Sequence, residues 1–130
     1  MVSAVLRFDA AKRSIGNLST LGALNLSRNS ISGTIPTEIG DVLNLGNLYQ
    51  IDLGYNSLIG TLPTELGILG IFGNYLSYLD LSYNSLGGSI PSELLQNSPL
   101  TTLNLASNQL LGSIPTEIGV LNVGNWSSSF

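Results

Sequence analysis

One 16-residue phrase recurs four times along this chain, and each copy begins at a leucine and ends at a proline. The last copy reads LTTLNLASNQLLGSIP. A unit this short cannot bury its own apolar side, so successive copies must stack and share one core. The repeat therefore restricts the chain to a solenoid, in which each unit contacts mainly its neighbours. The copies are Leu21–Pro36, Leu48–Pro63, Leu76–Pro91 and Leu100–Pro115.

Each repeat consists of a part of constant length and a part of variable length. The asparagine of every copy is followed seven residues later by the proline, as Asn29 is by Pro36 and Asn108 is by Pro115. From each proline to the next asparagine the distance is 20, 21 and 17 residues. Insertions are tolerated in the part of a coil whose length is not fixed by packing, so we expect the variable part on the outer, convex side.

The constant part contains a triplet in which a polar residue stands between two apolar ones, as in Leu24–Leu26. Such alternation is typical of a short, half-buried strand. Stacked coil on coil, these strands predict a parallel sheet on the concave side, with leucines pointing inward and the residues between them pointing outward. The other triplets are Ile51–Leu53, Leu79–Leu81 and Leu103–Leu105.

An asparagine follows each predicted strand, where the chain must turn inward. Its amide can donate and accept hydrogen bonds, so it can satisfy backbone groups that such a turn leaves unpaired. We therefore assign a structural role to this asparagine ladder. It consists of Asn29, Asn56, Asn84 and Asn108.

Glycine, proline and glutamate then follow at constant spacing. The glycine suits a tight bend, and the proline sets φ at the entry to the convex part. A helical turn that begins at the proline would place the glutamate in its first turn, where the helix dipole favours a carboxylate. The three series are Gly33, Gly60, Gly88 and Gly112; Pro36, Pro63, Pro91 and Pro115; and Glu38, Glu65, Glu93 and Glu117.

With Asn, Gly and Pro in register with the leucines, residues 14–119 resemble the plant-type leucine-rich repeat, whose consensus is LxxLxxLxLxxNxLxGxIPxxLG. The resemblance implies an α/β solenoid of about four to five right-handed coils, with a concave parallel sheet and an irregular or short-helical convex side. Proteins with such repeats are typically ectodomains of receptor-like kinases and receptor-like proteins, or secreted inhibitors of cell-wall-degrading enzymes. The resemblance therefore implies an extracellular or cell-surface location and a role in signalling or defence.

We interpret residues 1–130 as a single leucine-rich repeat domain. Residues 1–20 form a lead-in or partial repeat, residues 21–119 the four repeats, and residues 120–130 a truncated tail. The Cys-bearing caps of the family are absent, so we expect the uncapped ends of the core to favour self-association. The sequence contains neither a signal-peptide pattern nor an apolar run of the roughly 20 residues that a membrane span needs.

Composition excludes several classes of function. The chain has no Cys and no His, so disulfides, thiolate or imidazole catalysis and the usual zinc ligands are excluded, and we expect no metal or cofactor. Asp52 and Asp80 have a spacing that a retaining glycosidase could use, but nothing in the sequence predicts a pocket around them, and we predict no enzyme. The four basic residues all lie within the first 28 positions, so we also expect no nucleic-acid partner.

The outward positions of the repeats are the candidates for binding a partner. Asp52 and Asp80 are expected on adjacent strands, about 4.8 Å apart, and tyrosines beside them supply contact area with a polar tip. The sequence therefore predicts recognition of a protein or peptide through the concave face. An ordinary solvated sheet face is the competing interpretation. The candidate residues are Arg28, Gln50, Asp52, Tyr55, Tyr78, Asp80, Tyr83, Thr102 and Asn104.

Two other functional hypotheses remain open at this point. A regular file of hydroxyls, formed by Thr34, Thr61, Ser89 and Ser113, would suit a repetitive surface such as ice or wall polysaccharide. The second hypothesis is that the chain is an inactive, truncated fragment. Three asparagines also match the glycosylation acceptor pattern, namely Asn17, Asn25 and Asn125.

Overall fold

The computed structural model describes residues 21–40, 48–70, 76–96 and 99–120. The predicted lead-in of residues 1–20 and nearly all of the predicted tail, residues 121–130, lie outside these described residues. So do most of the two longer convex segments, at residues 41–47 and 71–75.

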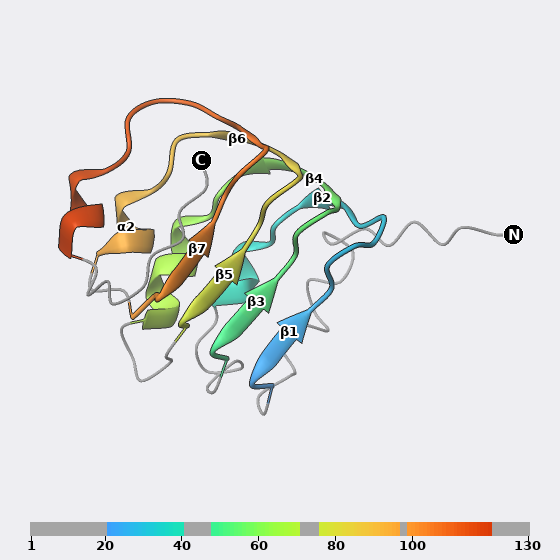
Figure 1. Ribbon diagram of the computed structural model, residues 1–130, viewed down its shortest axis with the longest axis horizontal. Coiled ribbons are helices and arrows are strands. Elements are labelled where there is room, and N and C mark those ends of the chain that lie inside the picture. Colours follow the sequence, from blue (N-terminus) through green and yellow to red (C-terminus); the bar gives the residue numbers. More distant parts are fainter. Residues whose placement is uncertain (1–20, 41–47, 71–75, 97–98, 121–130) are drawn as a thin grey trace, which may run out of the picture.

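The concave sheet is parallel and contains one strand from each repeat. Figure 1 shows the arrows of this four-stranded sheet side by side. Leu24, Ile51, Leu79 and Leu103 are register partners across it, so equivalent residues of successive repeats lie opposite one another. The predicted concave sheet is therefore confirmed. Its strands, in spatial order, are β1 (Ala23–Asn25), β3 (Gln50–Asp52), β5 (Tyr78–Asp80) and β7 (Thr102–Asn104).

A second parallel sheet lies after the asparagines, and the sequence did not predict it. Its strands are β2 (Ser32–Thr34), β4 (Ser57–Thr61), β6 (Ser85–Gly88) and β8 (Gln109–Leu110). Gly33, Gly60 and Gly88 belong to these strands, whereas Gly112 stands at a bend after β8. Their φ angles are positive, and a Cβ on Gly60 would lie 2.9 Å from the Cγ2 atom of Thr34. Glycine is needed because strand pairing brings the neighbouring coil this close.

Short helical turns form the convex side, each starting directly after its proline. In the first of them the N–H of Ile39 donates to the carbonyl of Pro36 at 3.1 Å. The glutamate of each repeat lies in the first turn, where the helix dipole favours its negative charge. The predicted short-helical convex side is therefore confirmed. The turns are η2 (Thr37–Gly40), η3 (Thr64–Gly70), α2 (Ser92–Leu95) and η4 (Thr116–Val120).

The core lies between the two sheets and the convex turns. The apolar residues of the second and third concave strands, such as Ile51 and Leu79, are fully buried. In the first coil Leu24 and Leu26 are only half-buried. At the fourth coil Leu111 and Ile114 are exposed beside a hollow of about 160 Å³. Burial is therefore deepest in the coils that have a described neighbour on both sides.

Asparagine side chains connect successive coils. The Nδ2 group of Asn56 donates to the carbonyl of Leu53 in its own turn and to that of Leu26 in the preceding coil, both at 3.0 Å. Its Oδ1 atom accepts the N–H of Ile31 at 3.0 Å. Asn84 and Asn108 repeat these contacts one coil further along. Each of these three side chains therefore satisfies backbone groups of two coils at once.

We expect replacement of Asn56 by alanine to lower the free energy of unfolding by about 1–3 kcal/mol, because half-buried carbonyls and one N–H lose their partner. Asn29→Ala is the matched control, since within the described ranges the exposed side chain of Asn29 bonds only to carbonyls of its own turn. Urea denaturation measures both variants. Equal losses would contradict the inter-coil role of Asn56.

Close packing between convex turns gives a second expected result. A Cβ on Gly67 would overlap the backbone carbonyl of Glu93 in the next coil. Gly67→Ala should therefore destabilise the fold by about 1–3 kcal/mol, although alanine is the better helix former. In the control variant Gly87→Ala the new methyl group meets its nearest atom at 3.8 Å. The urea midpoint of this control should not fall; a fall as large as that of Gly67→Ala would contradict the steric explanation.

Candidate recognition site

Two rows of outward residues run across the concave sheet, perpendicular to its strands. Gln50, Tyr78 and Thr102 are register partners in the first row, and Asp52, Asp80 and Asn104 are register partners in the second. All six are half-buried. The structure therefore brings together six of the nine residues that the sequence proposed for partner binding.

The second row also closes the turns that follow the strands. The Oδ1 atom of Asp52 accepts the N–H of Gly54 at 3.1 Å, two residues further along the chain. Asn25, Asp80 and Asn104 make the equivalent hydrogen bond in their own coils. Short acceptor side chains at this position stabilise the turn. These residues are thus less free to bind a partner than their outward position alone indicated.

Asp80 is the most strongly engaged member of the row. Its Oδ1 atom also accepts the hydroxyl of Ser82 at 2.6 Å, and its Oδ2 atom accepts the Nδ2 group of Asn104 at 2.9 Å. Ser82 is 1% exposed, and sequence reasoning missed it. A sequence signal for this contact exists, namely a serine two residues after the last residue of the strand. Ser27 stands at the equivalent position and makes the same hydroxyl contact with Asn25. Within the described ranges, no donor contacts the Oδ2 atom of Asp52.

Tyr78 lies next to these carboxylates. Partial burial raises the pKa of its phenol, and the negative charges of Asp80 and Asp52 raise this pKa further. The neutral hydroxyl of Tyr78 can donate a hydrogen bond to a partner.

Arg28, Tyr55 and Tyr83 do not lie on the strands, where the sequence placed them. The strands end earlier, and these residues stand in the following turn with φ near +55°. The left-handed conformation interrupts the alternation of the strand, and the asparagine of the ladder follows at once. The N–H groups of Arg28, Tyr55 and Tyr83 each donate to a carbonyl of the next coil at 2.9 Å.

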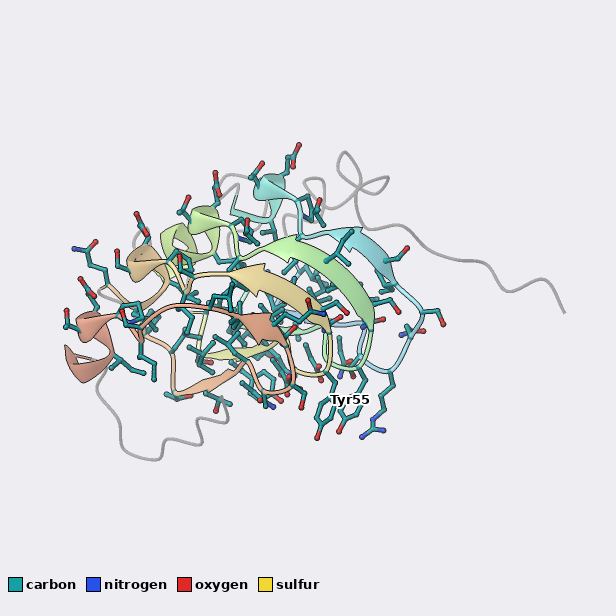
Figure 2. All side chains as sticks on the ribbon, turned by 90° about the horizontal axis from the view of Figure 1, so that it is seen from above. Tyr55 is labelled. Carbon is teal, nitrogen blue, oxygen red and sulfur yellow. The ribbon has the colours of Figure 1, made fainter. Side chains whose placement is uncertain are left out.

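The three side chains form a stack along the margin of the sheet. The rings of Tyr55 and Tyr83 lie 4.1 Å apart at an angle of 11°, and the Cζ atom of Arg28 lies 4.5 Å from the centre of the Tyr55 ring. Figure 2 shows the labelled Tyr55 extending away from the ribbon. A hydrogen bond with Tyr83 raises the pKa of the Tyr55 phenol, whereas the charge of Arg28 opposes this shift. We call this group the Arg28–Tyr55–Tyr83 stack.

An exposed tyrosine directly before β3 was missed by the sequence reasoning. Tyr49 is 51% exposed, and its carbonyl accepts the N–H of Ser77 at 2.9 Å. It stands outside the apolar-polar-apolar triplet, so strand alternation did not select it.

Among the three proposed glycosylation sites, Asn25 is exposed on β1, whereas Asn17 and Asn125 lie outside the described residues.

The predicted hydroxyl file begins on the second sheet, with Thr34 in β2 and Thr61 in β4, whereas Ser89 and Ser113 follow the ends of β6 and β8. Its members are exposed, but Thr34 is the register partner of Ile59, and Thr61 is the register partner of Gly87. Equivalent residues of that sheet are thus displaced by two positions from one strand to the next. The hydroxyls recur once per coil without facing one another across paired strands. The file consists of Thr34, Thr61, Ser89 and Ser113.

Neither a metal cluster nor a membrane-spanning helix is found in the described part of the chain. There, no three His, Cys, Asp or Glu side chains come together in a group that could hold a metal ion. No helix within the same ranges is long and apolar enough to cross a bilayer.

Stacked coils with an exposed concave sheet define a solenoid repeat protein. The family model described as Leucine Rich Repeat matches residues 20–42, 47–69, 75–97 and 99–121. This chain therefore belongs to the leucine-rich repeat family. A comparison with curated protein sequences found no match.

Solved structures of plant receptor ectodomains share this fold. The ectodomain of the receptor kinase SOBIR1 from Arabidopsis thaliana is 30% identical, with a TM-score of 0.75, and the match covers 96% of this chain and 66% of SOBIR1. A TDR receptor is 36% identical, with a TM-score of 0.77 and coverages of 88% and 18%. PEPR1, solved with AtPEP1, is 38% identical, with a TM-score of 0.71 and coverages of 85% and 15%. The chain thus spans less than two thirds of each of these relatives.

The electrostatics of the rows can be tested at Tyr78. Asp80→Asn removes a negative charge but keeps an oxygen that can accept the N–H of Ser82. The pKa of Tyr78 should therefore fall part of the way towards 10, while the contribution from burial remains. Because a raised tyrosine pKa favours the folded state only while the phenol is protonated, this contribution to stability is lost as the pH rises above 10. An NMR titration of labelled tyrosines measures the shift, and an unchanged Tyr78 pKa would contradict the electrostatic cause.

Proposed function

We propose that this chain recognises a protein or peptide through its concave rows and the Arg28–Tyr55–Tyr83 stack, as part of a receptor-type ectodomain at the cell surface. The observation that carries the proposal is the stack itself. Tyr55 and Tyr83 are 42% and 49% exposed although they are large aromatic residues, and exposed tyrosines of this kind are enriched at interfaces.

The geometry of the stack favours binding. Tyrosine combines a large apolar area with a hydroxyl that can donate or accept a hydrogen bond, and it is enriched at the energetically important centres of interfaces. Backbone hydrogen bonds to the next coil and ring stacking hold both side chains in place. A partner would therefore lose little side-chain entropy at this surface when it binds.

Related ectodomains support the class of partner. RGFR1 was solved with RGF2, and HAESA was solved with the peptide hormone IDA and the co-receptor SERK1. These proteins are 36% identical to this chain over 88–89% of its length. A binding role at the extracellular side of a membrane agrees with the ectodomain of HAESA, which was solved with a peptide hormone.

Binding should be measured by calorimetry with four probes, namely the AtPEP1, RGF2 and IDA peptides and the SERK1 ectodomain. We expect at least one probe to bind, and its affinity should fall about ten-fold or more in the double variant Tyr55→Asn/Tyr83→Asn, because aromatic anchors contribute most at such interfaces. Asparagine tolerates a positive φ, so the turn is retained.

Ile59→Thr is the matched control, since Ile59 is 53% exposed but belongs to the second sheet. Its affinity for the probe should equal that of the unmodified chain. Failure of all four probes to bind, or full affinity of the double variant, would refute the proposal. A loss of affinity in Ile59→Thr as large as that in the double variant would move the site to the other sheet.

A further inference from the structure

The Arg28–Tyr55–Tyr83 stack ends one coil before the last described repeat. Arg28, Tyr55, Tyr83 and Ser107 occupy equivalent positions and share the same backbone conformation, with φ between +53° and +56°. Their side chains therefore leave the backbone in equivalent directions, one coil apart. The first three are in contact, but the fourth is a serine, which is too short to cover a ring.

Within the described part of the chain, the outer face of Tyr83 is therefore uncovered. Its inner face stacks on Tyr55, and none of the described residues places a ring or a guanidinium against the other face. Tyr83 and Ser107 are both exposed. A side chain supplied by a partner can therefore occupy the next position of the stack, above Ser107.

The opposite end of the stack shows which chemistry such a face accepts. There the guanidinium of Arg28 covers the Tyr55 ring at 4.5 Å, within the range of a cation–π contact. A planar guanidinium can lie parallel to an aromatic ring, whereas the ammonium of lysine is a compact and strongly hydrated charge.

The surrounding charge also favours a cation. Arg28 is the single basic residue within the described ranges, and it lies at the far end of the stack. Asp52 and Asp80 end the strands that lead into Tyr55 and Tyr83, and the whole chain has a net charge of −4. The potential at the Tyr83 end should therefore attract a positive side chain.

We infer that the partner inserts an arginine side chain over the outer face of Tyr83, next to Ser107. This inference rests on the proposed recognition function and specifies its ligand chemistry. An arginine there would complete a four-membered stack with a guanidinium at each end.

The test compares hexa-arginine amide with hexa-lysine amide, two peptides of equal charge, by NMR titration of the chain. We expect the chain to bind hexa-arginine roughly two- to five-fold more tightly, which is the size of an exposed cation–π contact. Tyr83→Asn should abolish this preference. Tyr49→Ser should retain it, because Tyr49 is equally exposed but does not belong to the stack.

Ser107→Arg provides an independent test, because an arginine already adopts this backbone conformation at Arg28. The new guanidinium should cover Tyr83, shift its ring resonances and remove the preference for hexa-arginine. Equal affinity of the unmodified chain for both peptides, no binding of hexa-arginine, or a preference retained in Tyr83→Asn would overturn the inference. A preference for an aromatic peptide such as hexa-tyrosine would also overturn it, and would assign the position to a ring.

The two proposals fail separately. If the receptor peptides or SERK1 bind in a Tyr55/Tyr83-dependent manner while hexa-arginine shows no preference, the recognition function stands and the arginine assignment is wrong. If hexa-arginine shows the expected preference but none of the four protein and peptide probes binds, the stacking position stands and the proposed class of partner is wrong.

Discussion

Every coil of this solenoid has to turn inward after its concave strand, and the turn leaves backbone groups that water cannot reach easily. The asparagine side chain resolves this constraint. Asn56 bonds to carbonyls of its own coil and of the preceding one, and it accepts an N–H from the preceding coil as well. This bridge supports the stacking of coils, together with the backbone pairing that aligns the strands.

The same turn presents the candidate recognition residues. A left-handed residue precedes each asparagine, so its side chain is directed away from the core and into solvent. Tyr55 and Tyr83 occupy this position, and strand pairing brings their rings together. Scaffold and recognition surface are therefore parts of one structural element. Asp80 shows the consequence of this double role. Its carboxylate accepts hydrogen bonds from Ser82 and Asn104, so it stabilises the turn and is less available to bind a partner.

The elements that were predictable are those whose signal lies within a single repeat. Alternation located β1, β3, β5 and β7, and the proline and glutamate located the convex helical turns. The second sheet escaped prediction because Ser32–Thr34 and its equivalents show no apolar alternation. Pairing with the neighbouring coil makes them strands. For Tyr55 and Tyr83 the sequence identified the residues but placed them on the strand face. The alternation of apolar and polar residues does not reveal that these two residues adopt a positive φ.

The sequence by itself determined the solenoid architecture, because a short apolar unit repeated in register has no other way to bury its leucines. It also determined that imidazole and thiolate chemistry are absent, since the chain has neither His nor Cys. Only the tertiary structure decided which outward residues act together. Arg28, Tyr55 and Tyr83 stand 27 and 28 residues apart in the chain, and they come into contact because parallel pairing brings equivalent positions of successive coils to within stacking distance.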